Sequence, residues 1–180
     1  MQHKIVQKTD PILRKRAEEV LPDQIKSRKI KDIIHKMSAS LRASSNGIGL
    51  AAPQIGIPLA IFIVSEEAIV VKKESDIIYN EDEKEKRRKR WKHFVFINPR
   101  LIKSSRKKEL MPEGCLSVDG IFGQVRRAKQ VTVEALDENS RMLRVGASGL
   151  FAQVLQHETD HLNGVLFIDK AENLEKLPNE

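Results

Sequence analysis

The sequence contains very little cysteine and few aromatic residues, and each shortage excludes a class of protein. Cys115 is the only cysteine, so no disulfide can form within the chain and a disulfide-stabilised secreted fold is excluded. One Trp and one Tyr are too few for a surface that stacks nucleic-acid bases. No apolar run reaches the ~18 residues of a membrane-spanning helix, so no membrane partner is expected. The first residues also lack the apolar stretch of a signal peptide, and we therefore expect a cytoplasmic protein.

Charge, in contrast, is abundant. The 32 Lys and Arg residues outnumber the 25 Asp and Glu residues, which gives a net charge of +7. Such a surplus suits an acidic partner such as RNA, and solubility alone would also explain it. Residues 72–92 hold nine basic and six acidic residues, a net charge of +3 in one short stretch. The 180 residues suffice for one well-buried domain. We expect a single domain over residues 1–180, with a charged, solvated insertion at about 72–92.

Hydrophobic periodicity predicts two helices. In the first, apolar residues recur at helical spacing with Lys and Arg on the other face; Asp23 is its expected N-cap, and residues 44–47 (SSNG) end it. These apolar residues are Ile30, Ile33, Ile34, Met37 and Leu41. The second helix is expected to run from an N-cap at Ser148 to Asn163, with Gly164 at its C-terminus.

Short apolar or alternating segments predict the strands. They are residues 59–64, residues 94–97 ending at Asn98-Pro99, and a hairpin formed by residues 130–136 and 142–145. Residues 47–54 contain too much Gly and Pro for a regular element, and Gly114 with the nearby Pro112 suggests a shaped turn within residues 113–117. Strands before and between two helices predict an α+β domain.

The second predicted helix carries the most specific pattern in the chain. His157-Glu158-Thr159-Asp160-His161 is an HExxH pentad, in which histidines one helical turn apart can bind one metal ion. Glu158 beside them can accept a proton from metal-bound water. Taken alone, the pentad leaves two readings open: a metal site, or a surface helix end with chance polar residues.

A metal site needs a third ligand, and the sequence favours one upstream of the pentad. A metzincin would carry a third His where this chain has Phe167, and only 19 residues follow His161, too few for a later helix with a glutamate ligand. Cys115 is the main candidate, because Cys-His-His leaves a fourth position open for water, as in catalytic sites. The other reading of a lone cysteine is a small buried hydrophobe. His3, His35 and His93 are weaker candidates.

Three motifs together resemble a peptide deformylase, the enzyme that removes the N-formyl group from the formyl-methionine of nascent polypeptides. Residues 47–54 (GIGLAAPQ), 113–117 (EGCLS) and 156–164 (QHETDHLNG) occur in the family's order, and the similarity extends from residue 10 to residue 169. The resemblance implies a metal-dependent amide hydrolase. It also implies antiparallel β-sheets packed around a central C-terminal helix that carries the HExxH pattern, with the N-terminal helix on the outside.

Carried over position by position, the resemblance also implies residue roles. Cys115, His157 and His161 would bind the metal, and Glu158 would act as the acid and base. The Gln54 side-chain amide and the Leu116 backbone N–H would donate hydrogen bonds to the oxyanion. Seven residues would contact the substrate or line its methionine pocket: Gly47, Ile48, Gly49, Met111, Gly114, Leu150 and Val154.

The resemblance further implies an ion pair between Glu113 and Arg127 that braces the metal loop. Three positions depart from the family pattern. Asp119 and Arg126 stand where many relatives have proline, and they would loosen the strand after the cysteine. Gln153 occupies a position that is often basic or apolar, and it changes one wall of the expected methionine pocket.

For the cofactor we expect one divalent metal ion, Fe²⁺ by resemblance, with Zn²⁺, Ni²⁺ or Co²⁺ as alternative occupants of the same donor set. The expected partners are N-formylmethionyl peptides on nascent chains and, transiently, the ribosome, which residues 84–92 would contact; no sequence-specific nucleic acid is expected. One alternative is an HExxH metallopeptidase that cuts internal bonds, against which the missing downstream ligands argue. The other is a basic ribosome- or RNA-binding protein with a structural metal, for which a fourth protein ligand is lacking.

Overall fold

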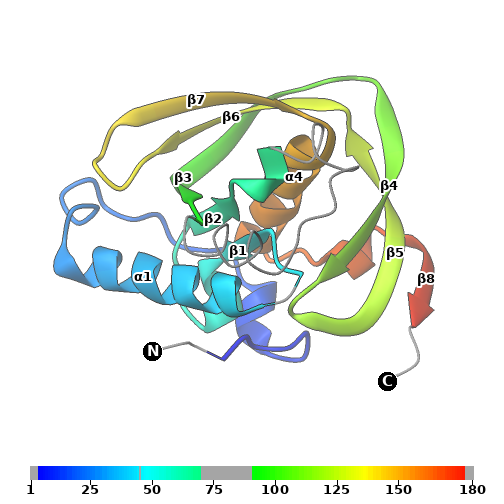
Figure 1. Ribbon diagram of the computed structural model, residues 1–180, viewed down its shortest axis with the longest axis horizontal. Helices are drawn as coiled ribbons and strands as arrows, with labels where there is room; N and C mark the ends of the chain where they lie inside the picture. The colour runs from blue at the N-terminus through cyan, green and yellow to red at the C-terminus, as the bar shows by residue number, and fades with distance from the viewer. Residues whose placement is uncertain (1–3, 45, 70–90, 177–180) are drawn as a thin grey trace, which may run out of the picture.

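The computed structural model describes residues 4–44, 46–69 and 91–176 (Figure 1). The insertion predicted at 72–92 therefore lies outside the described residues, apart from Trp91 and Lys92. The elements before it are η1 (Pro11–Arg14), α1 (Arg28–Ala43), β1 (Gly49–Ala51), η2 (Ala52–Ile55) and β2 (Ile61–Ser65). After it come β3 (His93–Ser104), β4 (Lys108–Cys115), β5 (Val118–Ala128), β6 (Gln130–Leu136), β7 (Met142–Ser148), α4 (Gly149–Leu162), η3 (Phe167–Asp169) and β8 (Glu172–Lys176).

The strands form two antiparallel sheets. One has five strands in the order β1-β2-β3-β6-β7, and the other has three in the order β4-β5-β8. Figure 1 shows α4 in the middle of the molecule, with β3, β6 and β7 arching over it and β4, β5 and β8 beside it. The prediction of an α+β fold with antiparallel sheets is confirmed. Of the described helices, none has both the length and the apolar character needed to cross a membrane.

Helices cover the two faces of β2, and this explains why every residue of that strand is buried. Phe62 and Val64 point to one face and pack with Val154 and Leu155 of α4. Ile61 and Ile63 point to the other face, because successive strand residues alternate in direction, and they join the apolar side of α1. That side consists of the five residues expected from the sequence: Ile30, Ile33, Ile34, Met37 and Leu41.

The prediction of an N-cap at Asp23 is wrong. The helix begins at Arg28, and Ser27 is its N-cap, whose Oγ accepts a hydrogen bond from the Ile30 N–H at 3.3 Å. Two consecutive turns precede the helix. The Gln24 N–H donates to the Leu21 carbonyl, and the Ser27 N–H donates to the Gln24 carbonyl. The predicted C-terminal end is confirmed, since Ser44 caps the helix.

Two segments that were not expected to be strands are strands. Residues 47–54 contain the short strand β1, in which Leu50 and Ala51 are fully buried against β2, followed by η2. The turn predicted within residues 113–117 lies at Leu116–Ser117, and residues 112–115 before it are the end of β4. Pro112 is tolerated there because β4 is an edge strand.

β3 also continues beyond Asn98-Pro99, where the sequence predicted its end. A register shift between Ile97 and Arg100 accommodates Asn98, whose φ is 50°. The Asn98 side chain holds this irregularity by bonding to both the N–H and the C=O of Val20, each at 2.8 Å. The second helix matches its prediction within a residue, because α4 follows Ser148 and ends before Asn163.

Candidate metal centre and active site

Three side chains from two elements converge at the centre of the molecule. α4 places His157 and His161 one turn apart, and the end of β4 brings Cys115 beside them. His161 Nε2 lies 3.2 Å from both Cys115 Sγ and His157 Nε2, and the three donor atoms all lie within 4.8 Å of one another. Neighbouring ligand atoms around a tetrahedral zinc-sized ion are about 3.3–3.6 Å apart. The donor set and its spacing therefore fit a divalent metal ion.

The electrostatics also favour metal binding at His161. Its side chain is 1% exposed, and its Nδ1 has no hydrogen-bond partner in the described part of the chain. Burial and the neighbouring His157 hold the pKa of His161 well below its usual range. The imidazole is therefore neutral, which is the form that binds a metal.

A buried ion pair orients the other histidine. Glu113 Oε2 lies 3.0 Å from His157 Nδ1, which leaves Nε2 to face the metal position. Arg127 donates two hydrogen bonds, of 2.7 and 2.9 Å, to the same carboxylate, and a third of 2.6 Å to Asp160 of α4. Burial opposes ionisation of Glu113, but the hydrogen bonds from Arg127 and His157 outweigh it and lower its pKa to about 2. The Glu113–Arg127 pair expected from the resemblance is thus present.

Glu158 lies beside this centre, and its burial is not offset by hydrogen bonds like those that Glu113 accepts. It is 2% exposed, and its Oε2 has no hydrogen-bond partner among the residues that the structure describes. Burial, and to a smaller extent the charge of Glu113, raises the pKa of Glu158 to about 7 against the opposing effect of His157. The glycine at position 49 makes room for this carboxylate, because a Cβ there would lie 2.3 Å from Glu158 Oε1.

Gln54 is held so that its amide nitrogen faces the metal position. The Ala51 N–H donates to Gln54 Oε1 at 2.8 Å, which fixes the amide orientation and turns Nε2 toward Ser117 Oγ at 3.2 Å and Cys115 Sγ at 3.5 Å. Leu116 occupies the turn directly after the cysteine. Sequence reasoning missed Ser117, whose N–H also lies 3.4 Å from the cysteine sulfur.

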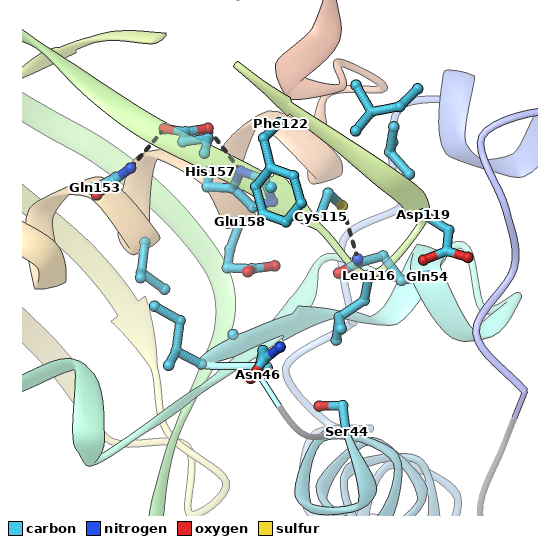
Figure 2. A pocket seen from close by; sticks show the side chains of 18 of the residues that line it. Ser44, Asn46, Gln54, Cys115, Leu116, Asp119, Phe122, Gln153, His157 and Glu158 are labelled. Atoms are coloured by element: carbon cyan, nitrogen blue, oxygen red, sulfur yellow. Dashed lines mark hydrogen bonds and ion pairs between the residues drawn. The ribbon is translucent and has the colours of Figure 1, made fainter. Parts of the chain in front are cut away.

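A cleft of about 560 Å³ opens beside these residues (Figure 2). Of the expected substrate-binding residues, all but one line it: Gly47, Ile48, Gly49, Gly114, Leu150 and Val154. Met111 is the exception. It lies on β4 four residues before Cys115, and at about 3.3 Å per residue this puts its backbone roughly 13 Å along the strand from the cysteine.

The sequence predicted no contacts for several lining residues, although Gln153 was expected at one wall of the methionine pocket. Gln153 donates from Nε2 to the Pro112 carbonyl at 2.8 Å and to Glu113 Oε1 at 3.4 Å, so it ties β4 to α4 at the wall where it was expected to depart from the family. Ser44, Asn46 and five consecutive residues of β5, Val118 to Phe122, also line the cleft. The sequence could have indicated the β5 residues, because they follow Cys115 within a few positions. A hairpin turn at Leu116–Ser117 returns the chain to the site.

Comparison with known proteins agrees with this geometry. A family model described as polypeptide deformylase matches residues 2–177. The chain belongs to the polypeptide deformylase family. The chain is 42% identical over 168 residues to peptide deformylase 1A, chloroplastic/mitochondrial, of Arabidopsis thaliana, covering 92% of this chain and 60% of the relative. It is 39% identical to the peptide deformylase of Carboxydothermus hydrogenoformans, covering 96% and 95% of the two chains.

Solved deformylase structures share the fold. A Synechococcus elongatus peptide deformylase in complex with actinonin has a TM-score of 0.75 at 34% identity, over 95% of this chain and 79% of that one. A Met-Ala-Ser-bound class I type b peptide deformylase from Acinetobacter baumannii has a TM-score of 0.78 at 29% identity, over 94% and 99%. The chain spans about 60% of the length of the two plant relatives, from Arabidopsis thaliana and Solanum lycopersicum.

Proposed function

We propose that this chain hydrolyses the N-formyl group from the N-terminal formyl-methionine of nascent polypeptides and releases formate. The observation that carries this proposal is the cluster of Cys115, His157 and His161 next to an open cleft. Glu158 lies beside it, and its Oε2 has no hydrogen-bond partner among the described residues. Membership of the deformylase family supports the same reaction. We assign the activity to one catalytic domain over residues 1–180.

Cys115, His157 and His161 would hold one divalent metal, and we infer Fe²⁺, with Zn²⁺, Ni²⁺ or Co²⁺ as alternatives that suit one thiolate and two imidazoles. When bound, the metal supplies the acidity that makes water a nucleophile near neutral pH and polarises the formyl carbonyl. Glu113 and Arg127 keep His157 oriented for this role.

Glu158 is the proton carrier in this proposal. A buried carboxylate with a pKa of about 7 can accept a proton from water and then donate it to the departing amine at neutral pH. The amide of Gln54 and the backbone N–H of Leu116 would donate to the oxyanion that forms on the formyl oxygen. The hydrogen bond from Ala51 fixes the Gln54 amide in advance, so no reorganisation is needed during the reaction.

The cleft suits an extended peptide that begins with methionine. Ile48, Leu150 and Val154 would surround the methionine side chain. β1 and β4 are edge strands of the described sheets, so Gly49 and Gly114 lie where unpaired main-chain groups can bind a substrate backbone. Gly47 lies two residues before β1 and also lines the cleft. The Met-Ala-Ser complex of the Acinetobacter baumannii relative supports a substrate of this kind.

For the cellular setting we propose cytoplasmic action on formylmethionyl chains as they emerge from the ribosome, with transient ribosome contact. The relatives differ in compartment, because two plant enzymes are named chloroplastic or chloroplastic/mitochondrial. The segment proposed for ribosome contact, residues 84–92, lies outside the described residues except for its last two positions.

The test is formate release from a formyl-Met tripeptide by protein purified anaerobically with ferrous iron. Stoichiometric formate with no internal cleavage is expected, and the matched acetyl-Met peptide serves as the control. Cleavage of internal bonds would instead support an HExxH metallopeptidase. Metal-loaded protein that releases no formate would overturn the proposal and leave the structural-metal alternative.

A further inference from the structure

The N-terminal arm, residues 4–10, binds the two residues that are proposed to stabilise the oxyanion. The Val6 N–H donates to the backbone carbonyl of Gln54 at 2.9 Å. The side chain of the next residue, Gln7, donates from Nε2 to the Leu116 carbonyl at 3.1 Å. In Figure 1 the arm is the blue stretch near the N-terminus, which passes close to the turn between β4 and β5. Two adjacent residues of the arm therefore contact both proposed donors.

The backbone of the arm is fixed on both sides of Gln7. Before it, Ile5 and Val6 pack against two different apolar clusters of the core. After it, the Asp10 N–H donates to the Gln7 carbonyl at 2.8 Å and closes a turn. This turn leads into η1, in which Leu13 is fully buried. The Gln7 side chain therefore reaches across to the site from an anchored position, although it is itself exposed.

Leu116 depends on this contact more than Gln54 does. Gln54 is buried, and the Ala51 N–H holds its side chain as well. Leu116 belongs to no strand, because it lies in the turn between β4 and β5. Within the part of the chain that the structure describes, Gln7 is the one hydrogen-bond partner of the Leu116 backbone. The bond to its carbonyl restricts rotation of the adjoining peptide group, while its N–H stays available to an oxyanion.

We propose that Gln7 is a positioning residue for deformylation, whose side-chain amide holds Leu116 so that the Leu116 N–H meets the oxyanion. The inference rests on the proposed function and adds a residue to it. A donor stabilises the oxyanion best when it is held in place before the reaction. Because the oxyanion forms only in the transition state, loss of this positioning lowers kcat and leaves KM nearly unchanged. The net strength of a neutral hydrogen bond corresponds to about a threefold to tenfold change in rate.

The experiment measures kcat and KM for formate release from a formyl-Met tripeptide by iron-loaded Gln7→Met. Methionine has a similar length but no N–H donor. The matched control is Gln24→Met, because Gln24 is also exposed and its side chain makes no hydrogen bond within the described residues. In Gln7→Met we expect kcat to fall by about threefold to tenfold, with KM and metal content unchanged. Gln24→Met should match the wild type.

Gln7→Lys restores a flexible N–H donor and should recover most of the lost kcat. A bond that only stabilises the fold would lower the free energy of unfolding in urea and leave the kcat of the metal-loaded protein unchanged. A wild-type kcat in Gln7→Met, a loss confined to KM or to metal content, or a Gln7→Lys variant as slow as Gln7→Met overturns this inference alone. No formate from the wild type overturns the proposed function together with it. Circular dichroism of the three variants confirms that they are folded.

Discussion

Glu113→Gln tests the buried network behind the metal position, because it keeps the shape of the side chain and removes its charge. The Glu113 side chain is 3% exposed and that of Arg127 is 4% exposed. In the variant Arg127 keeps only Asp160 as a charged partner, and His157 loses the carboxylate that orients it. Removing one member of a buried ion pair typically costs about 3–5 kcal/mol.

The pKa of Glu113 gives a second, independent value for its contribution to the free energy of unfolding. A pKa held at about 2 instead of 4.5 corresponds to about 3 kcal/mol of stability contributed by the ionised form. Because Asp160 still pairs with Arg127, we expect a loss at the lower end, about 3 kcal/mol. The folded-state pKa is depressed, so this contribution is complete above pH 4.5 and is lost as the pH falls toward 2. The free energy of unfolding should therefore fall less steeply over this range in the variant than in the wild type.

Urea unfolding of the metal-free proteins measures the change in the free energy of unfolding without the contribution of metal binding. Glu109→Gln is the matched control, because Glu109 lies on the same face of β4 and pairs with Lys129, but both side chains are more than a third exposed. That variant should lose less than about 1 kcal/mol. Equal losses in the two variants, or a Glu113→Gln loss below about 1 kcal/mol, would refute the reasoning from burial.

Further variants separate the roles at the centre. Glu158→Gln should retain metal by elemental analysis while kcat falls by about 10²–10⁴, and loss of the metal would contradict a proton-transfer role. Cys115→Ser should weaken metal affinity by more than the roughly 10–100-fold typical of a lost supporting partner, and unchanged metal content would exclude the thiolate as a ligand. Gln54→Leu should lower kcat by about 10²–10³ with the metal retained, and an unchanged kcat would exclude the amide as an oxyanion donor. Gly49→Ala should lower kcat without unfolding the protein, because its Cβ would displace Glu158, and full activity would show that the carboxylate position is not critical.

Elements that depend on local patterns were predicted well. The hairpin of β6 and β7 follows from alternating apolar residues and the turn residues between them. The bounds of α4 follow from the residues at its two ends. In both cases the signals lie within a few residues of one another. The extension of β3 past Asn98 was not predictable in this way. It depends on two hydrogen bonds to Val20, which lies 78 residues earlier in the chain.

The candidate site likewise has features that the sequence predicted and features that it did not. The residue types of the metal site were identified from the sequence, and the deformylase resemblance supplied Glu113 and Arg127. The bond from Gln153 to the Pro112 carbonyl and the position of Asp119 on the cleft rim were not foreseen, because both require β4 and β5 to be placed against α4. Met111 is not among the residues that line the cleft, because it lies earlier in β4, and its contact with the substrate stays a prediction.

By itself, the sequence determined that His157 and His161 can share a metal, because helical periodicity puts residues four apart on one face. It also determined that only one thiolate could join them, because the chain has a single cysteine. Only the tertiary structure decided that this thiolate does reach them. Cys115 and His161 are 46 residues apart in the sequence, and the packing of β4 beside α4 brings Sγ to 3.2 Å from Nε2. Local geometry fixes the spacing within a helix, whereas contacts between distant segments are fixed by how the sheets and the helix bury their apolar faces together.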